Sequence, residues 1–84
     1  MTQLTLEMPE AAFSTLHLAP DELSREIRIA AAVKWYKLGR ISQGRGAEIA
    51  GLSRAEFIDA LSRYRVSPFQ YTEQELIDEL QDAD

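Results

Sequence analysis

The chain has no cysteine, which excludes a disulfide framework, a thiolate nucleophile and a cysteine-ligated zinc site. Long apolar runs are also missing: the longest, residues 29–33, is far too short to cross a bilayer. No basic patch followed by an apolar run stands at the start, so we expect no signal peptide. We therefore expect a soluble protein of a reducing cytoplasm.

Histidine is scarce as well, since His17 is the only one. A metal site or a catalytic imidazole needs partners, and the chain offers neither a second histidine nor a cysteine. We expect His17 to be a surface or partly buried side chain. Because no nucleophile motif, metal cluster or paired base is visible, we expect no enzyme, no cofactor and no metal.

The chain is long enough for a single domain, residues 1–84. Its charge is distributed unevenly along the sequence. Its net charge is −5, yet all nine lysines and arginines fall in residues 25–65 beside only four acids, so that segment carries +5. Residues 1–24 contain four acids and residues 66–84 contain six, with no basic residue in either. A basic middle between acidic ends indicates an anionic partner for the middle.

The basic middle contains a helix-turn-helix pattern over residues 42–65. Ser42 can cap a first helix, and Gly51 can adopt the positive φ that a tight corner between helices needs. Ser53 and Glu56 then form the S-x-x-E capping box of a second helix. A helix-turn-helix offers its second helix to the major groove of DNA. The alternative is an ordinary helical hairpin in a small core.

The two helices of this pattern have features that favour close packing. Small residues in the first helix allow a close approach, although Gly46 lowers helix propensity by about 1 kcal/mol relative to alanine. Apolar residues of the second helix recur at i, i+3, i+4 and i+7, which predicts one buried stripe. That stripe consists of Phe57, Ala60, Leu61 and Tyr64.

The remaining side of the second helix is polar and suits DNA. Arg54 is the best candidate for base reading, because an arginine fork reaches O6 and N7 of guanine. Ala55 suits a thymine methyl, and the other arginines suit phosphates. The alternative for each arginine is a solvated surface charge. The predicted DNA-binding residues are Arg40, Arg45, Ser53, Arg54, Ala55 and Arg63.

At the start of the chain, residues 2–8 alternate between apolar and polar, which predicts a half-buried β-strand within residues 1–10. A lone strand is not stable in water. We expect it to pair either with residues 66–71, the other strand candidate, or with its copy in a second subunit. Pro9 suits the beginning of a short turn or helix.

A long helix is predicted over residues 20–39, from Pro20 in its first turn to a stop at Gly39. Its apolar residues form two stripes, and a helix apolar on two faces is central or partly covered by another subunit. We assign Trp35 to the core or a dimer interface rather than to base stacking. The chain is short enough to need a partner copy, so we predict a homodimer. The predicted interface is Leu4, Leu6, Met8, Ile29, Val33 and Tyr36.

The acidic tail, residues 66–84, is predicted to begin extended and to end in a helix capped by Thr72. This tail contains more large apolar side chains than a disordered linker requires. They either dock into a groove of a partner protein or close this chain's own core. The predicted partner-binding residues are Phe69, Tyr71, Leu76, Ile77 and Leu80. Together the segments predict a mainly α fold: a helix-turn-helix core, a short N-terminal β-strand and an acidic C-terminal helix.

The chain resembles the small prokaryotic proteins of uncharacterised protein family 0175 over nearly its full length. The resemblance is carried by a strand ending in MPE, the helix DELSREIRIAAAVKWYKLGRIS, the acidic tail and, most specifically, AEIAGLSRAEF. It implies an antitoxin of a type II toxin–antitoxin pair that binds operator DNA and whose toxin resembles PIN-domain ribonucleases. The alternative is a small protein–protein adaptor that uses a helix-turn-helix shape without binding DNA.

Overall fold

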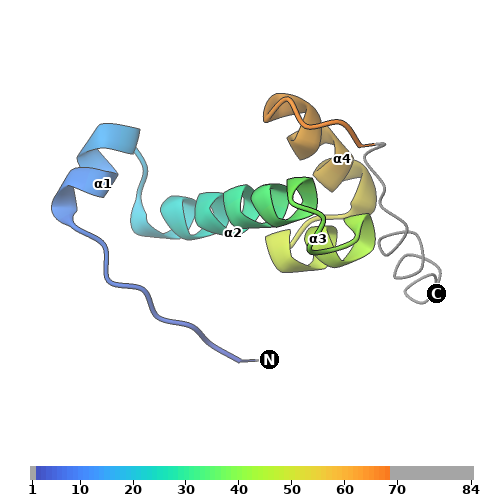
Figure 1. Ribbon diagram of the computed structural model, residues 1–84. Coiled ribbons are helices and arrows are strands. Elements are labelled where there is room, and N and C mark those ends of the chain that lie inside the picture. The colour runs from blue at the N-terminus through green and yellow to red at the C-terminus, as the bar shows by residue number, and fades with distance from the viewer. Residues whose placement is uncertain (1, 69–84) are drawn as a thin grey trace.

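A computed structural model of the chain describes residues 2–68, and these form helices with no β-strand among them. The elements are α1 (Glu10–Leu16), α2 (Pro20–Lys37), α3 (Gln43–Ala50) and α4 (Arg54–Arg63). The long helix α2 is the axis of the molecule: α3 and α4 pack at its C-terminal end, and α1 lies beyond its N-terminal end (Figure 1). The prediction of a mainly α fold is therefore confirmed.

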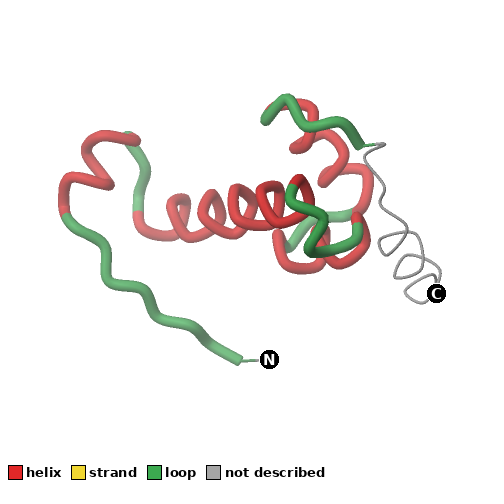
Figure 2. The backbone as a smooth tube through the Cα atoms, viewed as in Figure 1, coloured by secondary structure: helices red, strands yellow, loops and turns green. Residues whose placement is uncertain are grey.

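The strand predicted over residues 1–10 is not confirmed. Residues 2–9 run as an extended loop before α1 and form no β-ladder with any other described residue (Figure 2). One physical reason lies at residue 66, the start of the other strand candidate. The Val66 N–H donates to the Leu61 carbonyl at 2.8 Å, so this backbone closes the end of α4 instead of pairing with a strand. The predicted acidic C-terminal helix lies outside the described residues.

Helix α2 forms where the sequence predicts it. Pro20 occupies the first turn, and the Glu22 carboxylate accepts a hydrogen bond from the Ala19 N–H at 3.0 Å. At the other end Gly39 takes φ 74°, and the Arg40 N–H returns to the Trp35 carbonyl at 2.9 Å. The helix is therefore closed at both ends by groups that are local in sequence.

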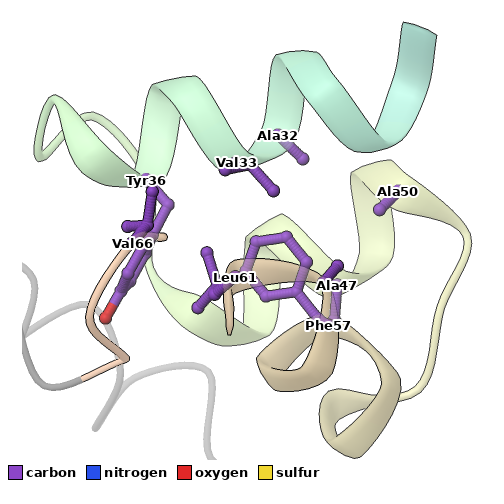
Figure 3. Close-up of a cluster of buried hydrophobic side chains, with 9 residues drawn as sticks. Ala32, Val33, Tyr36, Ala47, Ala50, Phe57, Leu61 and Val66 are labelled. Atoms are coloured by element: carbon purple, nitrogen blue, oxygen red, sulfur yellow. The ribbon is translucent and has the colours of Figure 1, made fainter. Parts of the chain in front are cut away.

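The core lies between α2, α3 and α4. Tyr36, Phe57 and Leu61 are its largest fully buried apolar side chains, and Figure 3 shows them pointing toward one another. The rings of Tyr36 and Phe57 meet edge to face, with centroids 6.1 Å apart and planes at 86°. Val66 closes the cluster from the segment after α4. The core cluster is Ala32, Val33, Tyr36, Ala47, Ala50, Phe57, Ala60, Leu61 and Val66.

This core corrects part of the predicted dimer interface. Val33 and Tyr36 are 3% and 0% exposed and belong to the chain's own core, while Ile29 is partly buried against it. The stripe that they mark is therefore covered by α3 and α4 rather than by another subunit. Within residues 2–68, no helix is both long enough and apolar enough to span a membrane.

Candidate nucleic-acid interface

Helix α3 is capped by a side chain at its start and by backbone hydrogen bonds at its end, where the corner to α4 lies. The Ser42 hydroxyl caps α3 by accepting from the Arg45 N–H at 3.1 Å. At the far end Gly51 has φ 72°, and the Leu52 N–H donates to the Ala47 carbonyl at 2.9 Å. These are the bonds of a Schellman ending, which needs a left-handed residue. The corner thus turns the chain within residues 51–53.

Helix α4 begins at a reciprocal capping box. The Ser53 hydroxyl accepts from the Glu56 N–H at 3.1 Å, and the Glu56 carboxylate accepts from the Ser53 N–H at 2.8 Å. The N–H of Ser53, and then its hydroxyl, stabilise the carboxylate and lower the pKa of Glu56 below its ordinary value. Ser53 therefore fixes the start of α4.

The inner face of α4 follows the predicted stripe up to Leu61. Phe57, Ala60 and Leu61 are each 0% exposed. Tyr64 departs from the prediction, because it is the last residue of the stripe and remains 39% exposed. Its hydroxyl donates to the Glu26 carboxylate of α2 at 2.8 Å. Partial burial, and then this bond, raise the pKa of Tyr64 above its ordinary value.

The outer face of α4 carries the residues predicted to contact DNA. Arg54, Ala55 and Arg63 are exposed on α4, with Arg54 at the edge of its buried face and Ala55 opposite that face. Between them lies Ile58, whose side chain is 37% exposed one helical turn after Arg54. Ile58 was not in the predicted site, although its outward helical position was visible in the sequence. An exposed apolar side chain here is suited to a thymine methyl.

Gln43 is a buried residue that sequence reasoning did not single out. It is 4% exposed at the start of α3. Its Oε1 accepts from Nε and Nη2 of Arg54 at 3.3 and 3.2 Å, and its Nε2 donates to the Pro68 carbonyl at 2.6 Å. The Tyr36 hydroxyl donates to the same carbonyl at 2.9 Å. Gln43 therefore connects the predicted base reader to the last described residue of the chain.

Other arginines divide between structural and exposed positions. Arg45 forms an ion pair with Glu48 at 3.0 Å, with both side chains more than half exposed, so this pair adds little stability. Arg28 of α2 donates from Nε to the Ile49 carbonyl at 2.8 Å and so satisfies the last turn of α3. Arg40 is exposed in the link before α3.

The remaining predicted sites are placed as follows. His17 is exposed at the end of α1 with φ 56°, and no group of three or more potential metal ligands occurs among residues 2–68. Leu4, Leu6 and Met8 of the predicted dimer interface are exposed in the extended segment. The predicted partner-binding residues all lie outside the described part of the chain: Phe69, Tyr71, Leu76, Ile77 and Leu80.

The model of an uncharacterised protein family, UPF0175, matches residues 1–84. A UPF0175 protein of Aeropyrum pernix is 36% identical over 81 residues, which cover 96% of this chain and 85% of the relative. A second UPF0175 protein of the same organism is 37% identical over 59 residues, 70% of this chain and 75% of that relative. No solved structure matches significantly.

Proposed function

The chain belongs to UPF0175, an uncharacterised protein family, and on that premise we propose that it is a DNA-binding antitoxin of a type II toxin–antitoxin pair. It binds operator DNA as a homodimer and neutralises a PIN-type ribonuclease toxin through its C-terminal tail. It works by binding alone, without catalysis or a cofactor. The toxin–antitoxin role and the PIN-type partner are what the resemblance implies, whereas DNA binding is argued from the residues and geometry of α4.

The placement of α4 is the observation that carries DNA binding. Its inner face is buried against α2 and α3, so its position is fixed by the core. Its exposed surface carries Arg54 near the start, at one edge, and Arg63 near the end, at the other edge, with Ala55 and Ile58 between them. A rigid second helix with an arginine near its N-terminus is what major-groove reading requires.

The hydrogen bond from Arg54 to Gln43 supports this role. An arginine on a helix surface loses rotamer entropy when it binds a base. Gln43 holds the guanidinium through Nε and Nη2 before DNA arrives, and Gln43 is itself held by the Pro68 carbonyl. Preorganisation of this kind lowers the cost of binding. The electrostatic setting agrees, because residues 25–65 carry +5 in a chain whose net charge is −5.

The test is binding to the DNA upstream of the chain's own gene, measured by fluorescence anisotropy with a scrambled duplex of equal length as competitor. We expect Arg54→Ala to weaken binding to the upstream duplex by about 1–3 kcal/mol. The difference in affinity between the upstream and the scrambled duplex should become smaller. Arg25→Ala is the matched control, since it removes an exposed arginine of α2. This variant should keep the wild-type difference in affinity between the two duplexes. Equal affinity of all three proteins for both duplexes would contradict the proposal.

Neutralisation is assigned to the tail because of its charge. Residues 66–84 carry six acids and no base, so they are repelled by DNA and attracted to a cationic surface. A ribonuclease presents a cationic path to its RNA, and an acidic strip can occupy that path. The tail starts from a fixed point, because Tyr36 and Gln43 both donate to the Pro68 carbonyl.

A growth assay tests this part. The neighbouring reading frame is expressed as the toxin, together with either the full chain or residues 1–68. We expect the full chain to restore growth and the shortened chain to fail while it still binds DNA. Rescue by residues 1–68 would show that the tail is not the neutralising element.

A second candidate function is a protein–protein adaptor that keeps the helix-turn-helix shape without binding DNA. The exposed Ile58 at the middle of the outer face of α4 favours it, because apolar anchors are common at the centre of protein interfaces. Ile58→Ala separates the two functions. A DNA reader should lose preference only at a thymine position, whereas an adaptor should lose affinity for its protein partner and show no DNA binding at all.

A further inference from the structure

An apolar hollow of about 470 Å³ lies between the extended N-terminal segment and α2. One wall is the segment itself, through Leu4, Leu6 and Met8. The opposite wall is the face of α2 that carries Ile27, Ala31 and Trp35 at successive helical turns. This is the second apolar stripe of α2, distinct from the stripe that α3 and α4 cover.

The two walls do not close on each other within one chain. Leu4 and Leu6 are 83% and 55% exposed, and Trp35 on the opposite wall is 39% exposed. Exposed leucines in a row along an extended segment are unfavourable in water. Residues 2–9 also form no β-ladder within the described chain, so their backbone groups can pair with another strand.

The sequence of the segment is complementary to itself. If two copies of residues 2–8 run antiparallel about a two-fold axis at Thr5, Leu4 of one copy faces Leu6 of the other. Gln3 then faces Glu7 on the polar side, and no two like charges are opposed. This register uses the whole segment, because Pro9 has no N–H to donate and ends the ladder.

We propose that residues 2–8 of two copies pair in this register to form a two-stranded antiparallel ribbon. Its apolar face, built from Leu4, Leu6 and Met8 of both copies, closes the hollow against α2 of each subunit. The occupant of the hollow is thus a second copy of this chain. The ribbon specifies how the proposed regulator dimerises. Only the biological purpose of the dimer rests on the proposed function; the strand pairing itself does not.

Absence of native cysteine makes the register directly testable by cross-linking. In the proposed ribbon the two Thr5 Cα atoms lie about 4.5–5.5 Å apart, within the range of a disulfide. The two Gln3 Cα atoms are offset by four residues, roughly 13 Å, which is too far. Both side chains point away from the apolar face by strand alternation, so neither substitution alters the hollow.

The experiment compares T5C with Q3C in the full chain under mild copper–phenanthroline oxidation, read on a non-reducing gel. We expect T5C to convert mostly into covalent dimer, several-fold faster than Q3C. Circular dichroism of both variants checks that the helices are intact. Wild-type chain should sediment at twice 9.5 kDa at micromolar concentration.

Three outcomes would overturn the proposal. The first is a monomeric wild type, which would leave the hollow to the acidic tail or to another protein. The second is a dimer in which T5C and Q3C cross-link at equal rates, which would place the two-fold axis elsewhere. The third is faster cross-linking of Q3C. None of these outcomes depends on DNA, so failure of the ribbon and failure of DNA binding remain distinguishable.

Discussion

A methyl group on Gly46 would lie 2.6 Å from Cζ of Phe57, closer than carbon atoms pack. The phenyl ring of α4 therefore occupies the space that any side chain at this position of α3 would fill. The ring cannot easily move, because Phe57 is 0% exposed and rests edge-on against Tyr36. Gly46, which weakens α3 as an isolated helix, is what lets α3 and α4 approach.

Gly46→Ala is therefore expected to destabilise the protein although it improves helix propensity. Overpacking costs about 1–3 kcal/mol, against a propensity gain of about 1 kcal/mol. We expect the free energy of unfolding to fall by up to about 2 kcal/mol, measured by urea denaturation.

The control is Gly46→Ala in a protein that has leucine instead of phenylalanine at position 57. Phe57→Leu alone should destabilise the core, but in its presence Gly46→Ala should lose most of its penalty. An unchanged penalty in the double variant would mean that the ring of Phe57 is not the obstacle. A stabilised Gly46→Ala would show that α3 and α4 are not packed as closely as described.

The bond between Tyr64 and Glu26 predicts a loss of stability in alkali. Partial burial, and then acceptance by the Glu26 carboxylate, raise the pKa of the folded Tyr64 hydroxyl above its ordinary value of 10.0. Its contribution is thus complete below pH 10 and is lost as the pH rises through the folded pKa. The difference in unfolding free energy between wild type and Tyr64→Phe should shrink over that range. A difference independent of pH up to 11 would rule out the bond.

The capping box of α4 predicts the opposite trend in acid. The Ser53 N–H and hydroxyl lower the pKa of Glu56, so its contribution is present above the ordinary value of 4.5 and is lost as the pH falls through the folded pKa. Ser53→Ala should cost about 1 kcal/mol at pH 7, measured by thermal or urea unfolding. Glu56→Gln should reduce the stability lost between pH 5 and 3. An identical acid profile in Glu56→Gln would contradict this assignment.

The position of Pro68 predicts where the tail can be removed. Residues 1–68 keep Val66, which is 6% exposed in the core, and the Pro68 carbonyl that Tyr36 and Gln43 both contact. Residues 1–65 lose both. We expect the melting temperature of 1–68 to stay near that of the full chain and that of 1–65 to fall by several degrees. Equal melting of the two fragments would show that residues 66–68 do not stabilise the core.

The helix boundaries were predictable from sequence because their signals are local. Ser42 and Ser53 cap helices, and Gly39 and Gly51 end them, within a residue or two of the prediction. Each signal acts between groups fewer than six residues apart, so it needs no knowledge of the tertiary structure. The fold class and the buried stripe of Phe57, Ala60 and Leu61 follow from the same local information.

Features that depend on contacts between helices were not predictable in the same way. Two apolar stripes on α2 indicate that both faces are covered, but they do not say what covers each one. The predicted dimer interface therefore wrongly includes Val33, which lies in the chain's own core. Gln43 reads as an ordinary polar residue until Arg54 and Pro68 are brought beside it. The Gly46–Phe57 approach likewise exists only once α3 and α4 are packed.

The most direct test of DNA binding is the salt dependence of affinity for the upstream duplex. If the basic middle of the chain contacts phosphates, the logarithm of the binding constant should fall linearly with the logarithm of salt concentration, and Arg63→Ala should reduce the slope by about one. A wild-type affinity that does not change with salt, or no binding at low salt, would contradict the proposal that α4 is presented to DNA.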